Sequence, residues 1–153
     1  MAKLKLVVAP ALSWDYLLNF NQSPPDETFP RSSKVIQDYQ QHKTNVISKY
    51  NNISEYITQT YFNKSNAAKF FRLVPNDFPY LLEDGIKHLV CWFNPFIFSY
   101  EAPDLNTIPD QINIIMKLFN RNLTLGKDWI YFENNTSARS VPGIRHIHIF
   151  IKK

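Results

Sequence analysis

The last strand-like segment of this chain alternates strictly between two kinds of side chain, and that alternation limits how the chain can fold. Residues 144–151 read Ile-Arg-His-Ile-His-Ile-Phe-Ile. Because successive side chains of a strand point to opposite faces of its sheet, the isoleucines from Ile147 onward share one face. His146 and His148 share the other, roughly 7 Å apart on the strand repeat. We therefore expect a sheet whose isoleucine face is core and whose histidine face is open.

The composition bounds the class of protein. A length of 153 residues suits a single domain, 1–153, with one core. The 44% hydrophobic and 20% charged residues are typical of a soluble globular protein. Only three glycines occur, which excludes a glycine-rich phosphate loop. The net charge of +4 is mild and the basic residues are scattered, so nucleic acid is not an expected partner.

Cysteine usage and hydropathy indicate the compartment. The single Cys91 lies in an apolar run, which excludes a disulfide framework and predicts a buried, inert thiol. The N-terminus, with Lys3 and Lys5 before a short apolar run, is faintly similar to a signal peptide, but Pro10 interrupts it. No stretch approaches the roughly 18 apolar residues that a membrane span needs. We expect a cytoplasmic or nuclear protein without a membrane partner, and favour the cytoplasm.

The first sixty residues predict a helical layer over about 13–62. Ser13 caps a short helix, and a proline-rich loop follows over 21–30. Apolar residues recur at spacings of three and four over 33–50, which predicts a longer helix. A third helix is expected over about 53–61.

The second part of the chain, about 68–153, predicts a sheet. Strands are expected at 70–74, 86–93, 128–133 and 144–151, with a helix inserted over about 109–122 that begins at Pro109. The fold class is therefore α+β, with an N-terminal helical layer packed on a small, mainly antiparallel sheet that ends in the His-x-His strand.

The order of motifs along the chain resembles that of a known family. The motifs are Trp14, Arg31-Ser32, Tyr39, Lys43, Tyr50, Leu-Val-Pro-Asn-Asp-Phe-Pro-Tyr at 73–80, Gly-Ile-Lys-His-Leu-Val at 85–90 with Trp92, Asn134, and Ser-Val-Pro-Gly-Ile-Arg-His-Ile-His-Ile-Phe at 140–150. Together they resemble the mostly fungal N-acetylglucosamine-induced proteins, also labelled a domain of unknown function. The resemblance implies a cytoplasmic protein linked to amino-sugar or nucleotide-sugar metabolism, and implies no particular reaction.

The chain departs from that family in the loop before the last strand. The family pattern is Asn-Pro-Pro-Ser-Leu-Gln-Ser-Val, whereas residues 134–141 read Asn-Asn-Thr-Ser-Ala-Arg-Ser-Val. The prolines are lost and Arg139 adds a positive charge. A role that requires a rigid loop is therefore not carried over.

The strand at 86–93 places His88 and Trp92 on one face. If this strand neighbours the last one, His88 joins His146 and His148, and the cluster permits several functions. The first is a metal site, completed by His88 or by Asp77. No spacing for a third ligand is recognisable, so we expect neither a metal nor another cofactor.

The second function is acid–base or nucleophilic chemistry on a phosphate ester or nucleotide, with His146 or His148 as the catalytic group. The strand partly resembles the His-x-His-x-His strand of histidine-triad nucleotide hydrolases, but Phe150 occupies the third position. Arg72, Arg139 or Arg145 would then contact the anion. Whether the protein is an enzyme stays open.

The third function, which we favour, is binding of a small molecule: a sugar, a sugar phosphate or a nucleotide. Flat aromatic faces combine with hydrogen-bonding and charged groups in the predicted ligand-binding residues, which are His88, Trp92, Asn76, Asp77, Tyr80, Arg72, Asn134, Ser140 and Arg145. In a fourth interpretation the histidines hydrogen-bond beneath the inserted helix and the surface binds only protein.

Local signals predict the setting of several other side chains. Asn76-Asp77 is expected to form a turn in which the side chains bond nearby backbone, although Asp77 orienting a histidine is an alternative. His42 is expected to be a solvated residue in the middle of the long helix, and Tyr39 to belong to the core.

Overall fold

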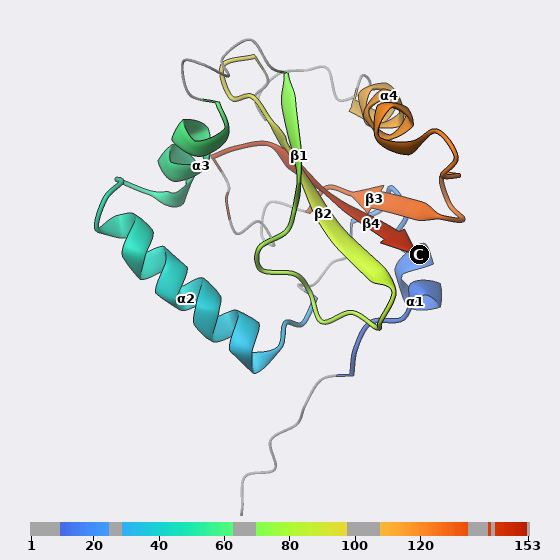
Figure 1. The fold of residues 1–153 in the computed structure, drawn as a ribbon, viewed down its shortest axis with the longest axis horizontal. Helices are drawn as coiled ribbons and strands as arrows, with labels where there is room; N and C mark the ends of the chain where they lie inside the picture. Colours follow the sequence, from blue (N-terminus) through green and yellow to red (C-terminus); the bar gives the residue numbers. More distant parts are fainter. Residues whose placement is uncertain are drawn as a thin grey trace, which may run out of the picture.

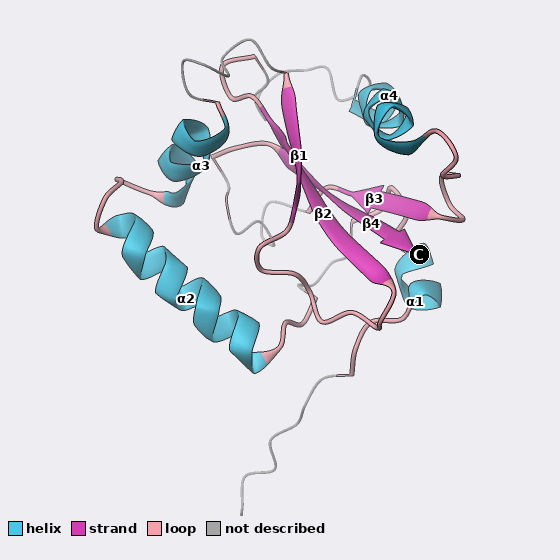
Figure 2. Cartoon of the chain, in the orientation of Figure 1, coloured by secondary structure: helices cyan, strands magenta, loops and turns pink. Residues whose placement is uncertain are grey.

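The computed structural model describes residues 10–24, 29–62, 70–97, 108–134, 141 and 143–152 (Figure 1). The elements are α1 (Trp14–Leu18), α2 (Ser33–Ile47), α3 (Ile53–Tyr61), β1 (Phe71–Pro75), β2 (Ile86–Phe93), α4 (Ile108–Asn120), β3 (Trp129–Phe132) and β4 (His146–Lys152). Helices therefore precede a small antiparallel sheet that has one helix inserted between its strands (Figure 2). The predicted α+β class, with the His-x-His strand last, is confirmed.

The N-terminal helices begin at polar caps, as the sequence predicts for Ser13. Its side chain accepts a hydrogen bond from the Tyr16 N–H, and Asn52 caps α3 in the same way. Ser32 caps α2 by accepting from the Val35 N–H. The cap is extended, with ψ of 157°, so Arg31 lies just outside the helix. This places the Arg31 side chain beside the segment that leads into β2.

The central strands of the sheet are β2 and β4, in the order β1-β2-β4-β3. The register pairs Trp92 with His146 and Val90 with His148. The assumed pairing of these two strands is confirmed, and with it the arrival of His88 on the face of the other two histidines. Strand β4 begins at His146, two residues later than predicted.

The isoleucine face of the sheet packs on α4. This core consists of Leu89, Cys91, Phe93, Ile112, Ile115, Met116, Trp129, Tyr131, Ile147, Ile149 and Ile151. Cys91 is fully buried there, and burial raises the pKa of its thiol to about 12, which fits an inert group. Because α4 lies on this face, the interpretation that the histidines bond beneath the inserted helix is wrong.

The histidine face is also covered, so the expectation of an open face is wrong. All three histidines on it are buried. Side chains from α1, α3 and the connecting segments cover this face, and the buried set is Leu12, Trp14, Leu17, Phe29, Ile57, Phe62, Tyr80, Val90, Trp92, Ile130, Phe132, Val141, Ile144 and Phe150. Alternation along a strand separates the two faces but does not say what packs on each.

The helices of the described residues include none with the length and apolar composition needed to cross a bilayer.

Helix α2 ends at Ile47, earlier than its apolar stripe predicts, and α4 begins at Ile108. The Ser48 cap of α2 adopts a helical backbone and its hydroxyl donates to the Asn45 carbonyl. Helices α2 and α3 lie together on one side of the sheet, and α4 lies on the other (Figure 1).

At Gly143, the segment before β4 packs closely against Ser54 of α3. A Cβ added at Gly143 would lie 2.9 Å from the Ser54 Cβ. We expect Gly143→Ala to lower the free energy of unfolding by about 1–3 kcal/mol, because the methyl group overpacks this contact. Urea denaturation measures the loss. In a Ser54→Gly background the same substitution should have a much smaller effect, and an equal effect in both backgrounds would contradict the close approach.

Candidate functional site

His88 and His148 form a buried hydrogen-bonded pair on adjacent strands. His88 Nε2 lies 2.8 Å from His148 Nδ1. The Tyr80 backbone N–H donates to His88 Nδ1 at 3.2 Å. The Asn134 side-chain amide lies 3.0 Å from His148 Nε2 and 3.1 Å from the Tyr80 hydroxyl. The pair is therefore enclosed by the turn before β2 on one side and by the end of β3 on the other.

The backbone N–H of Tyr80 determines where the protons of this pair sit. A main-chain N–H only donates, so His88 Nδ1 carries a lone pair and the neutral ring is protonated at Nε2. His88 Nε2 then donates to His148 Nδ1, which places the His148 proton on Nε2. Asn134 must turn its amide oxygen toward that N–H, since the orientation of an amide is assigned from its network. Both nitrogens of His148 are thereby engaged.

Burial keeps both rings of the pair uncharged near neutral pH. Desolvation, with a smaller effect from the Arg31 charge, lowers the pKa of His88 to about 3. The pKa of His148 is also well below its usual value, mainly through desolvation and further through the neighbouring His88, His146 and Arg31. The pair therefore offers no positive charge at physiological pH and is poorly suited to act as a general acid.

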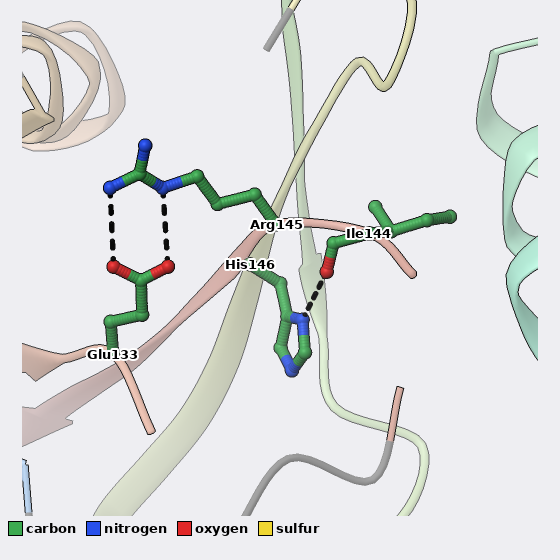
Figure 3. A network of polar contacts seen from close by, with 4 residues as sticks. All are labelled: Glu133, Ile144, Arg145 and His146. Atoms are coloured by element: carbon green, nitrogen blue, oxygen red, sulfur yellow. Dashed lines mark hydrogen bonds and ion pairs between the residues drawn. The ribbon is translucent and has the colours of Figure 1, made fainter. Parts of the chain in front are cut away.

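His146 is oriented separately from this pair. Its Nδ1 lies 2.8 Å from the Ile144 carbonyl oxygen, which only accepts, so in the neutral ring Nδ1 holds the proton and Nε2 the lone pair. Figure 3 shows Nε2 pointing away from Ile144. The Trp92 ring packs against the imidazole with 4.7 Å between centroids. Of the two predicted catalytic histidines, His146 thus has the geometry of a base, nucleophile or hydrogen-bond acceptor.

A small cavity of about 70 Å³ lies over the histidine face. Its floor is formed by Val90, Trp92, His146 and His148, and its walls by Arg31, Tyr39, His42, Ile53, Tyr56, Ile57, Tyr61, Val141 and the segment 74–78. Aromatic rings dominate the wall, and Tyr61 stacks on Trp92 at 6.4 Å between centroids. The space accommodates a few water-sized atoms.

Arg31 supplies a fixed positive charge to the cavity wall. Its Nε–H donates to the Phe78 carbonyl at 2.8 Å, and its guanidinium carbon lies 4.8 Å from the centre of the Tyr80 ring. Within the described residues the ion pairs are Lys34–Asp38 and Arg145–Glu133, so no carboxylate there neutralises Arg31. The guanidinium is held in place and keeps its full charge.

The structure brings most of the predicted site residues together in two groups: those that line the cavity and those in the hydrogen-bond network of the buried histidine pair. Asn76, Asp77, Trp92 and both predicted catalytic histidines line the cavity. The hydrogen-bond network of the buried pair holds His88, Tyr80 and Asn134. A separate, open groove of about 590 Å³ is lined by His88 and Tyr80, and Asn76 lines both this groove and the cavity.

Two predicted residues, Arg72 and Arg145, lie outside the cavity. Arg72 pairs in register with Trp92, and its guanidinium lies 5.8 Å from the Tyr61 ring centre, outside the cavity lining. Arg145 is bound to Glu133 by two hydrogen bonds of 3.2 and 3.4 Å and points away from His146 (Figure 3). Ser140, like Arg139, falls outside the described residues.

The turn at Asn76 has the predicted local bonding, because its side-chain oxygen accepts the Phe78 N–H at 2.8 Å. Asp77 is exposed, and the turn residue beside His88 is Asn76. Its amide nitrogen lies 3.3 Å from the protonated Nε2, and because both groups are donors this is a close contact and no hydrogen bond. Among the described residues no group of three histidine, cysteine or acidic side chains is arranged to hold a metal ion.

The sequence analysis missed the part of the wall supplied by α2. The expectation that His42 is solvated is wrong, since its ring is half-buried and packs against Tyr56 and Phe78 at 5.0 and 5.1 Å. Tyr39 lines the cavity and is only half-buried. Position 42 lies between Tyr39 and Val46 on the apolar stripe, and that spacing was the available signal.

Comparisons with known proteins agree with this architecture. A family model described as "Protein of unknown function (DUF3605)" matches residues 13–152. N-acetylglucosamine-induced protein 1 of Candida albicans is 34% identical over 86 residues, covering 50% of this chain and 32% of that protein, so the match spans about a third of the relative. A solved structure titled "Crystal Structure of HTC1" has the same fold, with a TM-score of 0.65, 20% identity, and coverage of 92% and 85% of the two chains.

The network predicts that His88 and His148 are both neutral and both protonated at Nε2. Nitrogen-15 NMR of the imidazole rings at neutral pH should show Nδ1 with the chemical shift of an unprotonated nitrogen in each ring. His146 should show the opposite tautomer, with the proton on Nδ1. An Nδ1-protonated ring at His88 would contradict the role assigned to the Tyr80 N–H.

Acid should destabilise the fold through the same pair. In the unfolded chain each imidazole takes up a proton as the pH falls below about 6.5, whereas the folded pair does not. The unfolded state then binds more protons, so stability is complete above that pH and is lost below it. We expect up to about 2 kcal/mol of loss per histidine between about pH 7.5 and about pH 5. Urea denaturation across this range measures it. A His148→Asn variant should lose stability less steeply, and equal steepness would contradict the assignment.

Proposed function

The chain belongs to the DUF3605 family of proteins of unknown function, and from that premise we propose that it binds a small polar ligand of the amino-sugar or sugar-phosphate class in the cavity above His146. The observation that carries the proposal is the convergence, in one cavity, of several aromatic rings with the polar side chains of Asn76, Asp77 and His146. Pockets for small molecules combine an apolar wall with a few oriented polar groups in this way.

The polar groups of the cavity suit a sugar derivative. Asn76 and the exposed carboxylate of Asp77 are acceptors for hydroxyl hydrogens, and the stacked Tyr61 and Trp92 rings provide flat apolar surface. His146 contributes a nitrogen acceptor at the floor. These groups come from β2, β4, α3 and the turn before β2, so the ligand would contact several elements at once.

The size of the cavity limits what enters it. Sites for whole small molecules usually enclose about 300–1,000 Å³, whereas this cavity has about 70 Å³. Only a terminal group of the ligand therefore fits inside, and the rest of the molecule would lie at the mouth near Asp77. A phosphate group, an acetamido group or a ring hydroxyl is of suitable size.

The relative from Candida albicans supports the choice of amino sugars as the first ligands to test, because its name describes induction by N-acetylglucosamine. Induction by a sugar is expected of proteins that take part in its use. We therefore propose a cytoplasmic role linked to amino-sugar or nucleotide-sugar metabolism.

A second candidate is catalysis on a phosphate ester or nucleotide, with His146 as acid, base or nucleophile. It is favoured by the orientation of the imidazole, whose Nδ1–H is held by the Ile144 carbonyl, as is common for reactive histidines. His148 is less suited, because both its nitrogens are engaged by His88 and Asn134.

Binding should be detected by a thermal-shift screen of amino sugars, their phosphates and nucleotide sugars, followed by calorimetry. Asp77→Asn should weaken binding of the best ligand about tenfold, because a charged acceptor is lost. The matched control is Asp84→Asn, which changes an exposed carboxylate outside the cavity lining and should leave binding unchanged. If the ligand is consumed and a folded His146→Gln variant stops the turnover, the second candidate holds. The absence of any shift across the screen would contradict both.

A further inference from the structure

Tyr39 has an unusual environment on the cavity wall. Its hydroxyl oxygen is buried and has no hydrogen-bond partner, one of two such side-chain atoms within the described residues. Leaving a buried hydroxyl unpaired costs about 1–3 kcal/mol in general, and a ligand oxygen that accepted its hydrogen would remove that cost. The ring itself packs against Phe78 at 4.8 Å between centroids.

Positive charge gathers around this ring. The Arg31 guanidinium carbon lies 5.8 Å from its centre and the Lys43 ammonium nitrogen 4.3 Å. Arg31 uses only its Nε–H within the described residues, for the Phe78 carbonyl. The Nη groups of a guanidinium form the fork that matches the oxygens of phosphate or carboxylate. The cation is therefore placed and oriented before any ligand arrives.

Negative charge near this position is sparse. Asp77 is the acidic residue of the cavity lining, and it is exposed, so solvent screens its repulsion of an anion. The rings of His88 and His148 beneath the cavity are buried and hydrogen-bonded to each other, and they add no negative charge that would oppose an anion. Arg31 thus faces the cavity as an uncompensated cation.

We propose that the cavity is an anion subsite, in which Arg31 and the Tyr39 hydroxyl bind the phosphate group of a phosphorylated ligand. This inference rests on the proposed function and adds the chemical class of the ligand. The phosphate oxygens accept from the Arg31 fork and from the hydroxyl, which gains its missing partner. The volume of about 70 Å³ suits a group of this size, and the sugar remains at the mouth.

The test uses inorganic phosphate, glucosamine 6-phosphate and glucosamine as calorimetric probes of the full chain. Arg31→Gln should weaken binding of both phosphate-containing probes at least about tenfold. The matched control is Lys34→Gln, which removes an exposed cation three residues away that pairs with Asp38. It should leave the affinity unchanged and so exclude a general effect of net charge.

Tyr39→Phe keeps the ring and removes only the hydroxyl. It should weaken phosphate binding several-fold while the melting temperature of the free protein is unchanged or higher, because an unpaired buried hydroxyl has been removed. A purely structural tyrosine would leave the phosphate affinity unchanged, and that result would overturn the proposal.

The probes separate failure of this inference from failure of the proposed function. Equal binding of glucosamine and its phosphate, unaffected by Arg31→Gln, would overturn the anion subsite and leave ligand binding in place. No binding of any probe by the wild-type protein, together with no hit in the wider screen, would overturn both.

Discussion

The hydrogen bond from the Tyr80 backbone N–H to His88 is the interaction on which the histidine face depends. Burying two imidazoles between aromatic side chains is tolerated only when each polar nitrogen has a partner of the right kind. The bond fixes the His88 tautomer, which fixes that of His148 and then the orientation of Asn134. One main-chain donor thereby ties the turn before β2 to both central strands and to the end of β3.

This arrangement divides the chemistry of the site between adjacent histidines. His148 is neutral and hydrogen-bonded at both ring nitrogens, whereas His146 is oriented separately, by the contact of its Nδ1 with the Ile144 carbonyl. Because the buried pair is neutral and no carboxylate of the described residues forms an ion pair with Arg31, this guanidinium is the cation of the cavity wall without a bound counter-ion. A low-dielectric floor beneath a fixed cation favours an anion more than a solvated surface would.

The sequence predicted what strand periodicity and capping chemistry determine. The shared face of His146 and His148 and the cap at Ser13 follow from alternation and from local hydrogen bonding, whereas the pairing of the two histidine strands was assumed and is confirmed by the structure. The sequence did not predict the covering of the histidine face or the placement of His42, because both depend on how distant segments pack. His42 was expected to be solvated because histidine is a polar residue type. Its neighbours Tyr56 and Phe78 come from other segments, and only the tertiary fold brings them to it.

The wall and the floor of the cavity differ in how firmly they are held. The floor belongs to central strands that are paired on both sides, whereas α2 buries a single side chain, Val46. Tyr39 and His42 of the same helix pack against Phe78 and line the cavity. Local stability follows buried apolar contact. A ligand group that fills the cavity therefore adds contacts to α2, so that ligand binding and docking of this helix stabilise each other.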